Sequence, residues 1–425
     1  MSRARVLVAS ALGYWLVGCT CQDPHRTYGP NIVLVVVDTV RADHLGTYGY
    51  TRQTDAAMQA FSAKSTRFTH AYSHAPWTKP SVATMLTSKL PRDHGVRAWE
   101  DTLPPDVLTL AEVLKLADYR TEAYVSHHAL SPEDTQLDRG FDVFDISAYE
   151  GTDPHKATSA HKVSDLGIAA LDRWEPGVPS FLMLHYFDPH NYYQKHDEFP
   201  FGGQRIDKYD AEIAYTDLHL GRFLKHLEDS GHLEDTIVVI TADHGEAFGE
   251  HGIRLHTTDL HDELIRVPLL IRVPGLAPST EAHTVGHMAL TPTLLSLVGL
   301  PIPTSFEGQP MGVVRGSLGL KADRQIFSAT THEADKRSVV SGDHKVIRDF
   351  EHDTWLFYDL GADPKELLPL QPDPTHEALK AAILAEEDKP PRAAGKAPMS
   401  DKQREILEEL GYLEADPADP ADPGE

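Results

Sequence analysis

Cysteine is almost missing from this chain of 425 residues, which contains only Cys19 and Cys21. The chain beyond residue 21 therefore has no disulfide bond, no cluster of thiolate zinc ligands and no cysteine nucleophile. Basic residues are also few: the chain has 39 Lys and Arg residues but 64 Asp and Glu residues, which gives a formal net charge of −25. Since binding to nucleic acid needs a basic surface, we expect no nucleic-acid partner. A small anionic substrate remains compatible with this charge, because a bound metal ion can reverse it locally.

A long hydrophobic run is missing as well. The apolar run Val6–Gly18 is too short to span a bilayer comfortably, but it has the length of a secretory signal peptide and follows two arginines. Its end, Leu16-Val17-Gly18-Cys19, resembles the lipobox of bacterial lipoproteins, whose cysteine is lipidated. We therefore predict a signal peptide at 1–18, a lipidated Cys19 and a tether at 19–30. These features imply export and a lipid anchor in a membrane of the bacterial cell envelope, on its periplasmic face or at the cell surface. A plain signal peptide or a short N-terminal anchor is the alternative.

From Asn31 onward, apolar runs with strand spacing and helix spacing alternate, which is typical of an α/β sheet covered by helices on both faces. The expected strands are Ile32–Val37, Ala123–Val125, Phe181–Leu184, Thr236–Ile240 and Val267–Val273, and the expected helices are Leu108–Leu116, Ile213–Leu227 and Ala289–Val298. After about Leu370 the composition shifts toward Pro, Lys, Ala and Asp. This shift predicts an acidic, partly disordered tail at 371–425, with disorder at 389–397 and a short amphipathic helix at Lys402–Leu413.

Carboxylates follow two of the expected strands directly. Asp38 comes after Ile32–Val37, and Asp243-His244-Gly245-Glu246 comes after the strand that begins at Thr236. In open α/β sheets the ligand crevice lies outside the carboxyl ends of the strands, and an aspartate there can bind a hard cation. For Asp38 alone, a role in a turn or a helix cap is the alternative.

One segment carries a resemblance to a known family. Thr78-Lys79-Pro80-Ser81-Val82 resembles the sulfatase signature Cys-x-Pro-Ser-Arg, which opens a helix and whose cysteine is oxidised to formylglycine. The segments that follow Asp38 and Asp243 also resemble sulfatase motifs, and the resemblance covers about Asn31 to Leu370. It implies an α/β, alkaline-phosphatase-like sandwich with a mainly parallel central sheet and a small C-terminal subdomain. The expected boundaries are 31–300 for the catalytic domain and 301–370 for the subdomain.

The sequence departs from the sulfatase pattern at three positions. Thr78 replaces the cysteine and cannot become the aldehyde, Val82 replaces the arginine, and Thr39 replaces the second aspartate of the first motif. A threonine at this position is similar to members of the wider superfamily, among them nucleotide pyrophosphatases/phosphodiesterases and lipid phosphoethanolamine transferases, in which a metal-bound threonine is the nucleophile. The resemblance therefore implies that Thr78 is a metal-activated nucleophile. The alternative is that Thr78 only caps the helix.

The resemblance also implies a metal site and a set of supporting residues. Asp38, Thr78, Asp243 and His244 form a mixed oxygen and nitrogen ligand set for one divalent metal ion. The set suits Ca, Zn, Mn or Mg; its nitrogen ligand favours zinc or manganese, whereas calcium is usual in sulfatases.

Several histidines follow strand ends or motif positions, and they complete the expected site. His190 and His256 are expected to contact the leaving group or to act as general acid. The residues expected to lie around the metal or to bind a second metal are His128, His185, Asp188 and Lys79. For His185 the alternative is a core histidine bonded to backbone, for His256 a surface histidine, and for Lys79 a solvated surface charge.

We therefore predict a metal-dependent hydrolase of sulfate or phosphate esters, with a slight preference for phosphate because the aldehyde and the arginine are missing. Its expected substrate is an anionic ester, on a glycan or a lipid. One alternative is a transferase that moves a phospho head group onto an envelope glycan or lipid. Another is an inactive sulfatase-fold lipoprotein that binds glycans.

Overall fold

The computed structural model describes residues 29–149 and 158–397. The predicted signal peptide, Cys19, most of the tether and the helix predicted at Lys402–Leu413 lie outside these residues. No helix within them combines the length and the apolar character that crossing a membrane requires.

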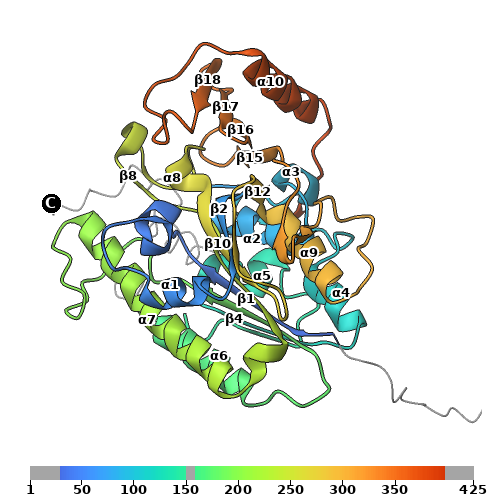
Figure 1. Cartoon of the computed structure of the whole chain (residues 1–425). Coiled ribbons are helices and arrows are strands. Elements are labelled where there is room, and N and C mark those ends of the chain that lie inside the picture. The colour runs from blue at the N-terminus through green and yellow to red at the C-terminus, as the bar shows by residue number, and fades with distance from the viewer. Residues whose placement is uncertain (1–28, 150–157, 398–425) are drawn as a thin grey trace, which may run out of the picture.

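The core of the molecule is a nine-stranded sheet with a parallel centre (Figure 1). Its central strands, all parallel, are β5 (Val143–Asp145), β4 (Arg120–Val125), β6 (Ser180–Tyr186), β1 (Asn31–Val37) and β7 (Thr236–Ala242). The side chains of Ile32–Val36 are fully buried, as expected for a β-branched run covered on both faces. This arrangement confirms the mainly parallel α/β sheet predicted from the sequence.

The other end of the sheet changes direction. β10 (Arg266–Arg272) runs antiparallel to β7 and to its other neighbour, β2 (Thr66–Tyr72). Two short strands, β11 (Ser279–Glu281) and β12 (Val285–Gly286), then pair in parallel with β2. The carboxyl ends of β1, β6 and β7 therefore share one edge of the sheet, whereas β10 begins at that edge.

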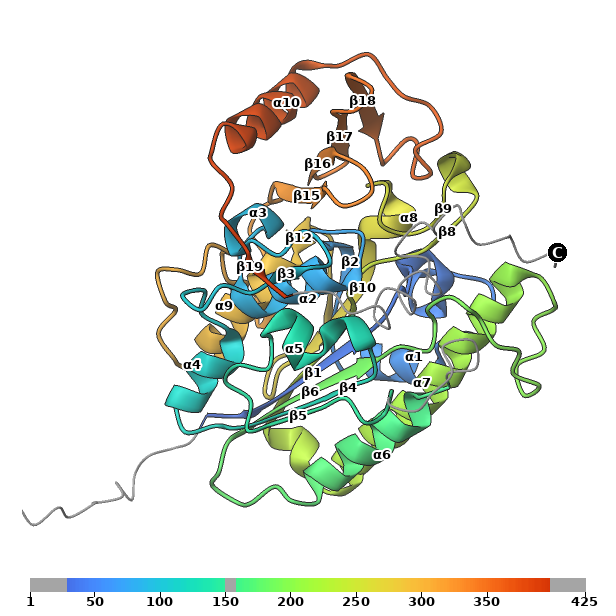
Figure 2. The same cartoon turned by 180° about the vertical axis from the view of Figure 1, so that it is seen from behind.

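Helices cover both faces of the sheet (Figures 1 and 2). One face carries α1 (Ala56–Ser62), α6 (Ala160–Leu171) and α7 (Arg205–Asp229), and the other carries α2 (Thr78–Thr87), α4 (Leu110–Leu116) and α9 (Leu290–Leu297). Shorter helices are α3 (Pro91–His94), α5 (Pro132–Thr135) and α8 (Asp262–Ile265). Every residue of α2 is buried, so this helix lies inside the molecule rather than on its surface.

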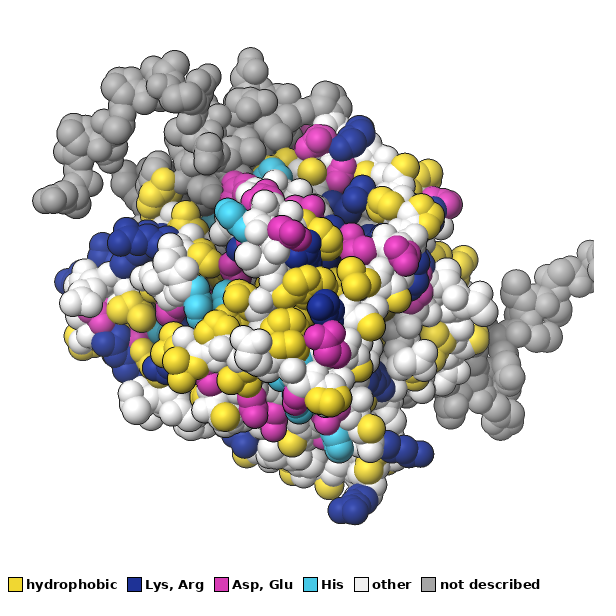
Figure 3. All heavy atoms as spheres, turned by 90° about the horizontal axis from the view of Figure 1, so that it is seen from above, with side chains coloured by type: hydrophobic (Ala, Val, Ile, Leu, Met, Phe, Trp, Pro, Cys, Tyr) yellow, Lys and Arg dark blue, Asp and Glu magenta, His cyan; other side chains and the backbone are white. Residues whose placement is uncertain are grey.

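A small antiparallel sheet lies above the central one and forms the C-terminal subdomain (Figure 1). Its strands are β15 (Ile326–Thr330), β16 (Lys336–Ser341), β17 (His344–Asp349) and β18 (Thr354–Asp359), paired in chain order. Two small hairpins lie outside these sheets, β8 (Ala247–Phe248) with β9 (Arg254–Leu255) and β13 (Gly312–Val314) with β14 (Ser317–Gly319). On the described part of the face in Figure 3, Lys and Arg are scattered among Asp and Glu.

The chain after Leu370 differs from its predicted disorder. Residues 374–387 form α10, whose Leu379 and Ile383 pack into a core cluster with strands of the small sheet. The next segment forms β19 (Gly395–Lys396), which pairs with β3 (Asp101–Thr102) of the catalytic part. The expectation of disorder at 389–397 was wrong because it rested on composition, whereas this segment is held by pairing with a strand almost 300 positions earlier in the chain.

Candidate active site

The carboxyl ends of three parallel strands, β1, β6 and β7, bring polar side chains together at one edge of the sheet. β1 pairs in register with both neighbours, with Val37 opposite Tyr186 on one side and Ala242 on the other. Asp38 and Asp243 therefore leave adjacent strands at the same level, and β6 leads at that level into the segment that ends at His190. This register is the reason why residues about 150 to 200 positions apart meet at one sheet edge.

Thr39 ties these strand ends together. Its φ is 54°, its amide donates a hydrogen bond to Oδ1 of Asp243 at 3.2 Å, and its hydroxyl donates to the carbonyl of Pro189 at 2.8 Å. The residue that stands where sulfatase motifs have a second aspartate thus uses both polar groups for structural hydrogen bonds.

Thr78 is the first residue of α2 and is fully buried. Its Oγ1 lies 3.2 Å from Nε2 of His244 and 3.4 Å from Nε2 of His127. The helix start is fixed to the sheet edge because Ser81 donates a hydrogen bond to the carbonyl of Asp243 at 2.6 Å. The hydroxyl is therefore held on a rigid element, between two imidazoles.

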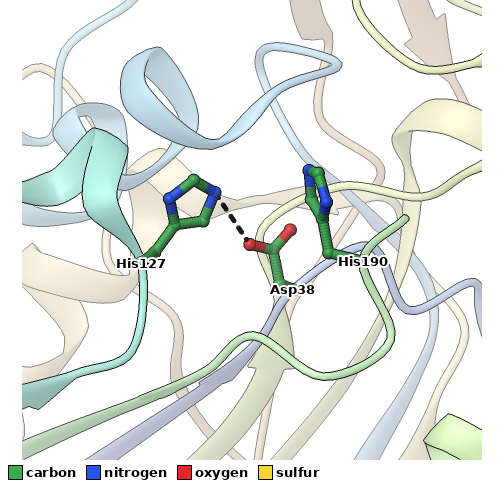
Figure 4. A group of neighbouring side chains, drawn as sticks. All are labelled: Asp38, His127 and His190. Carbon is green, nitrogen blue, oxygen red and sulfur yellow. Dashed lines mark ion pairs between the residues drawn. The ribbon is translucent and has the colours of Figure 1, made fainter. Parts of the chain in front are cut away.

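Asp38 lies between histidine rings, as Figure 4 shows for His127 and His190. Its Oδ2 is 3.3 Å from Nε2 of His127, and its Oδ1 is 3.5 Å from Nε2 of His244. Oδ2 of Asp243 is 3.7 Å from Nε2 of His244 and equally far from Nε2 of His185. Donor atoms from Asp38, Asp243 and His244 all lie within 4.8 Å of one another.

The carboxylates of this group fit a divalent cation. Both oxygens of Asp38 and Oδ2 of Asp243 are buried without a hydrogen-bond partner in the described chain. Burial, reinforced by the charges of Asp243 and Glu246, raises the pKa of Asp38 well above its usual range. Two buried carboxylates facing each other are unfavourable unless a cation or a proton lies between them, and oxygen atoms with one imidazole nitrogen are common metal ligands.

The backbone contacts of the histidines assign their tautomers. Nδ1 of His244 lies 2.8 Å from the carbonyl of Gly245 and therefore carries the hydrogen, which leaves the lone pair of Nε2 pointing at the carboxylates. In His127 the order is reversed, because Nδ1 accepts a hydrogen bond from the amide of Ala129 at 3.0 Å. Burial lowers the pKa of both histidines, that of His244 to about 4. Neutral His244 thus presents a lone pair with which it could hold a metal ion, and neutral His127 carries its hydrogen on Nε2, 3.4 Å from Oγ1 of Thr78.

His190 and His256 lie beside this group. Their ring centroids are 4.9 Å apart, and the ring of His256 is 4.8 Å from that of His244. Nδ1 of His256 lies 3.2 Å from Oε1 of Glu246, whose Oε2 accepts a hydrogen bond from Tyr193 at 2.8 Å. Burial lowers the pKa of His190 and of His256 to about 3, and it raises that of Glu246.

Three further residues, His128, Asp188 and His185, were predicted to lie around the metal or to bind a second one. His128 is half-buried with its ring near Tyr149, and the adjacent residue His127 is the one that contacts Asp38. The carboxylate of Asp188 accepts hydrogen bonds from the amide and the hydroxyl of Ser159, at 2.8 and 2.7 Å. His185 is buried beside Asp243.

Lys79 is not a solvated surface charge. Its side chain is buried, its ammonium group donates a hydrogen bond to the carbonyl of Trp99, and burial lowers its pKa to about 8.

Sequence reasoning missed three residues of the site. In the sequence analysis, His128 is selected rather than its neighbour His127, and Glu246 is included only as part of the Asp-His-Gly-Glu segment. Tyr193, which donates to Glu246, carries no sequence signal, because its place is set by the loop that follows β6. For His127 the available signal was its position two residues after the last strand residue, Val125.

Known proteins resemble this chain along most of its length. Residues 30–300 match the family model described as Sulfatase, and residues 249–389 match the one described as N-sulphoglucosamine sulphohydrolase, C-terminal. The Ulvan-active sulfatase of Formosa agariphila is 24% identical over 449 residues, covering 90% of this chain and 86% of that protein.

Solved structures share the fold at low sequence identity. A 2-O GAG sulfatase superimposes with a TM-score of 0.72 at 20% identity, covering 85% of this chain and 91% of that one. The phosphonate monoester hydrolase of Agrobacterium radiobacter superimposes with a TM-score of 0.67 at 17% identity, covering 84% and 94%. At this level of sequence identity, the two comparisons show a shared fold and nothing further.

Proposed function

Because this chain belongs to the sulfatase family of ester hydrolases, we propose that it is a metal-dependent enzyme that cleaves phosphate or sulfate esters through Thr78. The observation that carries the proposal is the position of the Thr78 hydroxyl, 3.2 Å from Nε2 of His244 and next to the orphaned carboxylate of Asp38. A buried threonine that served only as a helix cap would not need two unpaired carboxylates beside it.

Asp38, Asp243 and His244 would hold the cation, with the Thr78 hydroxyl as a further ligand. When bound, a divalent cation lowers the pKa of a hydroxyl ligand and neutralises the charge of a phosphate or sulfate oxygen. The site of an otherwise acidic protein thereby becomes attractive to an anion.

The chain's own residues then have defined tasks. The Thr78 hydroxyl gives its proton to water and its oxygen attacks phosphorus or sulfur, so that the bond to the threonine forms as the bond to the leaving alcohol oxygen breaks. His127 donates a hydrogen bond from Nε2 to the oxygen atoms that gain negative charge. The leaving oxygen takes a proton from the Glu246–His256 pair, whose Oε1 and Nδ1 lie 3.2 Å apart. Water then attacks the phosphorus or sulfur of the threonyl ester and gives a proton back to the Glu246–His256 pair. The bond to Thr78 breaks, the phosphate or sulfate leaves, and the Thr78 oxygen takes up a proton from water.

Phosphate esters or diesters are the favoured substrates. Thr78 cannot form the aldehyde of sulfatases, and Val82 replaces their signature arginine. The shared fold of a phosphonate monoester hydrolase supports this preference, whereas the names of the sequence relatives support sulfate. Transfer to an acceptor alcohol in place of water is the alternative outcome of the second step, and product analysis with and without such an alcohol separates the two.

The test compares turnover of an aryl sulfate, an aryl phosphate and an aryl phosphodiester by wild type and Thr78→Ala. We expect kcat to fall at least about 10³-fold in Thr78→Ala and to recover partly in Thr78→Ser. The matched control is Thr87→Ala, which removes another buried hydroxyl of α2 that bonds only to the carbonyl of Ala83. Equal rates for wild type and Thr78→Ala would remove Thr78 from the mechanism.

We further propose that the chain is exported and anchored by lipid at Cys19. The lipobox-like sequence Leu16–Cys19 supports this proposal. Metabolic labelling with radioactive palmitate tests it, because a Cys19→Ala variant should lose both the label and its place in the membrane fraction. A soluble, unlabelled wild-type protein would exclude the anchor.

A further inference from the structure

The segment 187–204 joins β6 to α7, contains no helix or strand and carries two residues of the candidate site. The ring of His190 lies 4.9 Å from that of His256, and the Tyr193 hydroxyl donates a hydrogen bond to Glu246. Loops longer than about 12–15 residues without secondary structure are uncommon in compact domains, and ordering each residue costs conformational entropy. The positions of His190 and Tyr193 therefore depend on contacts that other elements make with this loop.

Two anchors hold the start of the loop. The carboxylate of Asp188 accepts hydrogen bonds from the amide and the hydroxyl of Ser159, next to the start of α6. The carbonyl of Pro189 accepts a hydrogen bond from the hydroxyl of Thr39 at 2.8 Å. Because both anchors precede His190, the later part of the loop needs contacts of its own.

Glu212 of α7 holds the part of the loop that directly follows Tyr193. Its Oε1 accepts a hydrogen bond from the amide of Gln194 at 2.6 Å, and its Oε2 lies 2.9 Å from Nε2 of His196. The ring of His196 also stacks on that of Tyr215, with centroids 4.2 Å apart, so α7 contacts this histidine at two points. The Glu212 side chain is itself fully buried, which fixes the position of its carboxyl group.

A carboxyl group is costly at a buried position of a helix. Burial raises the pKa of Glu212 well above its usual range, and the nearby charge of Asp188 raises it further. Such a group is tolerated in the interior when hydrogen bonds compensate for the lost water. An apolar side chain would avoid the cost, but it would leave the Gln194 amide and the His196 ring without their partner on α7.

The contacts of Glu212 lead to the proton donor of the proposed reaction. Gln194 is the residue after Tyr193, whose hydroxyl donates a hydrogen bond to Oε2 of Glu246 at 2.8 Å. Oε1 of the same Glu246 lies 3.2 Å from Nδ1 of His256. A shift of the Gln194 backbone would therefore carry Tyr193 with it and remove a hydrogen bond that orients Glu246.

We propose that Glu212 is a positioning residue, which holds Tyr193 against Glu246 and thereby keeps the Glu246–His256 pair aimed at the leaving oxygen. Glu212 contacts the loop rather than the reacting atoms, so its effect is exerted through Tyr193. This inference rests on the proposed function, because the role of proton donor is assigned to the Glu246–His256 pair there. It gives α7 a task in the chemical step in addition to covering the sheet.

The first test compares two esters of the acid that the wild type cleaves, phosphate or sulfate. The 4-nitrophenolate ion leaves readily without a proton, because its nitro group stabilises the charge, whereas the leaving phenol of the phenyl ester depends more on a proton donor. In Glu212→Ala we expect kcat for the phenyl ester to fall at least about 30-fold and kcat for the 4-nitrophenyl ester to fall no more than about fivefold. Glu212→Gln keeps an acceptor for the Gln194 amide and should bring both values back to within about threefold of the wild type.

The second test measures the loop itself and does not depend on turnover. Lys195 is exposed and lies between Gln194 and His196, the two residues that Glu212 holds. Trypsin cleavage after Lys195 in the native protein should be at least about tenfold faster in Glu212→Ala than in the wild type, because local opening precedes cleavage. If Glu212→Ala does not fold, Glu212→Asp replaces it in both tests, since its shorter side chain cannot reach both contacts.

The matched control is Asp217→Ala, which removes another buried carboxylate of α7. Asp217 accepts hydrogen bonds from the amides of Ala57 and Met58 at the start of α1, at 2.7 and 2.9 Å. This variant should lower Tm but affect the two esters equally and leave the cleavage rate at Lys195 unchanged.

Two results would each overturn the positioning role. One is an equal loss of kcat for both esters in Glu212→Ala, and the other is a cleavage rate at Lys195 that equals the wild-type rate. If cleavage at Lys195 changes as expected but the wild type hydrolyses no ester, the proposed function fails, whereas the hold of Glu212 on the loop stands.

Discussion

The amide of Thr39 donates a hydrogen bond to Oδ1 of Asp243, across 204 positions of the chain. This bond occupies one oxygen of Asp243 and leaves Oδ2 without a partner in the described chain. Asp243 is thereby oriented with Oδ2 toward Asp38 and His244, which is the oxygen that we propose as a metal ligand.

Removal of the metal should abolish activity and destabilise the protein. We expect about one divalent ion per chain in metal analysis of the wild type and almost none in Asp38→Ala. Because a cation relieves repulsion between Asp38 and Asp243, treatment with a chelator should lower Tm in the wild type and not in Asp38→Ala. The control is Asp235→Ala, an exposed aspartate just before β7. A metal content unaffected by Asp38→Ala would contradict the site.

His127 and its neighbour should differ sharply in mutational effect. His127→Ala removes the hydrogen-bond donor beside Thr78 and should lower kcat by about 10²-fold or more, within the usual range for a group that assists the chemical step. His128→Ala should leave kcat within twofold, because His128 lies outside the contacts of Asp38. Steady-state kinetics of both variants measure these changes in kcat. A larger loss of kcat in His128→Ala than in His127→Ala would make His128 the site residue.

Lys345 should be essential for stability. Its buried ammonium group lies 2.8 Å from Asp262 and 2.8 Å from Glu366. Lys345→Met would leave the buried carboxylate of Glu366 without its cation and remove the nearest cation from Asp262, so it should lower the free energy of unfolding by about 3–5 kcal/mol. Urea unfolding measures the loss, and Lys321→Met, at an exposed lysine, should change it by no more than about 0.5 kcal/mol.

We expect His251 to make the folded protein less stable at alkaline pH. Its hydrogen bond with Glu263, 2.6 Å long, raises the pKa of His251 from 6.5 to about 9 in the folded protein. The folded state therefore holds this proton more tightly than the unfolded state, so the stabilisation is present below about pH 6.5 and is lost as pH rises through about 9. Melting temperatures from pH 6 to 10 should decline less in His251→Gln than in the wild type. The exposed His352→Gln should retain the wild-type slope; parallel curves for all three would contradict the assignment.

Much of the fold follows from local sequence pattern. The continuous β-branched run at Ile32–Val37 predicts a buried parallel strand, and the parallel-sheet rule then places Asp38 and Asp243 at one edge. The helix predicted as Ile213–Leu227 begins earlier, at Arg205, because its first turns carry buried polar residues such as Asp210 and Glu212 that hide the apolar pattern.

Other features depend on contacts that no local pattern encodes. Whether His127 or His128 turns toward Asp38 depends on the path of the chain after β4. The order of residues 389–397 depends on the pairing of β19 with β3. The structural role of Thr39 becomes visible only when Asp243 and Pro189 are brought beside it.

The pairing of β19 with β3 also bears on how firmly the subdomain is held. The chain leaves the catalytic part before β15, forms the small sheet and α10, and returns to the catalytic part at β19. The subdomain is therefore connected to the catalytic part at both of its ends. A module held by two separate crossings moves only if both connections bend, so the pairing of β19 with β3 restrains the small sheet and α10 against the central sheet.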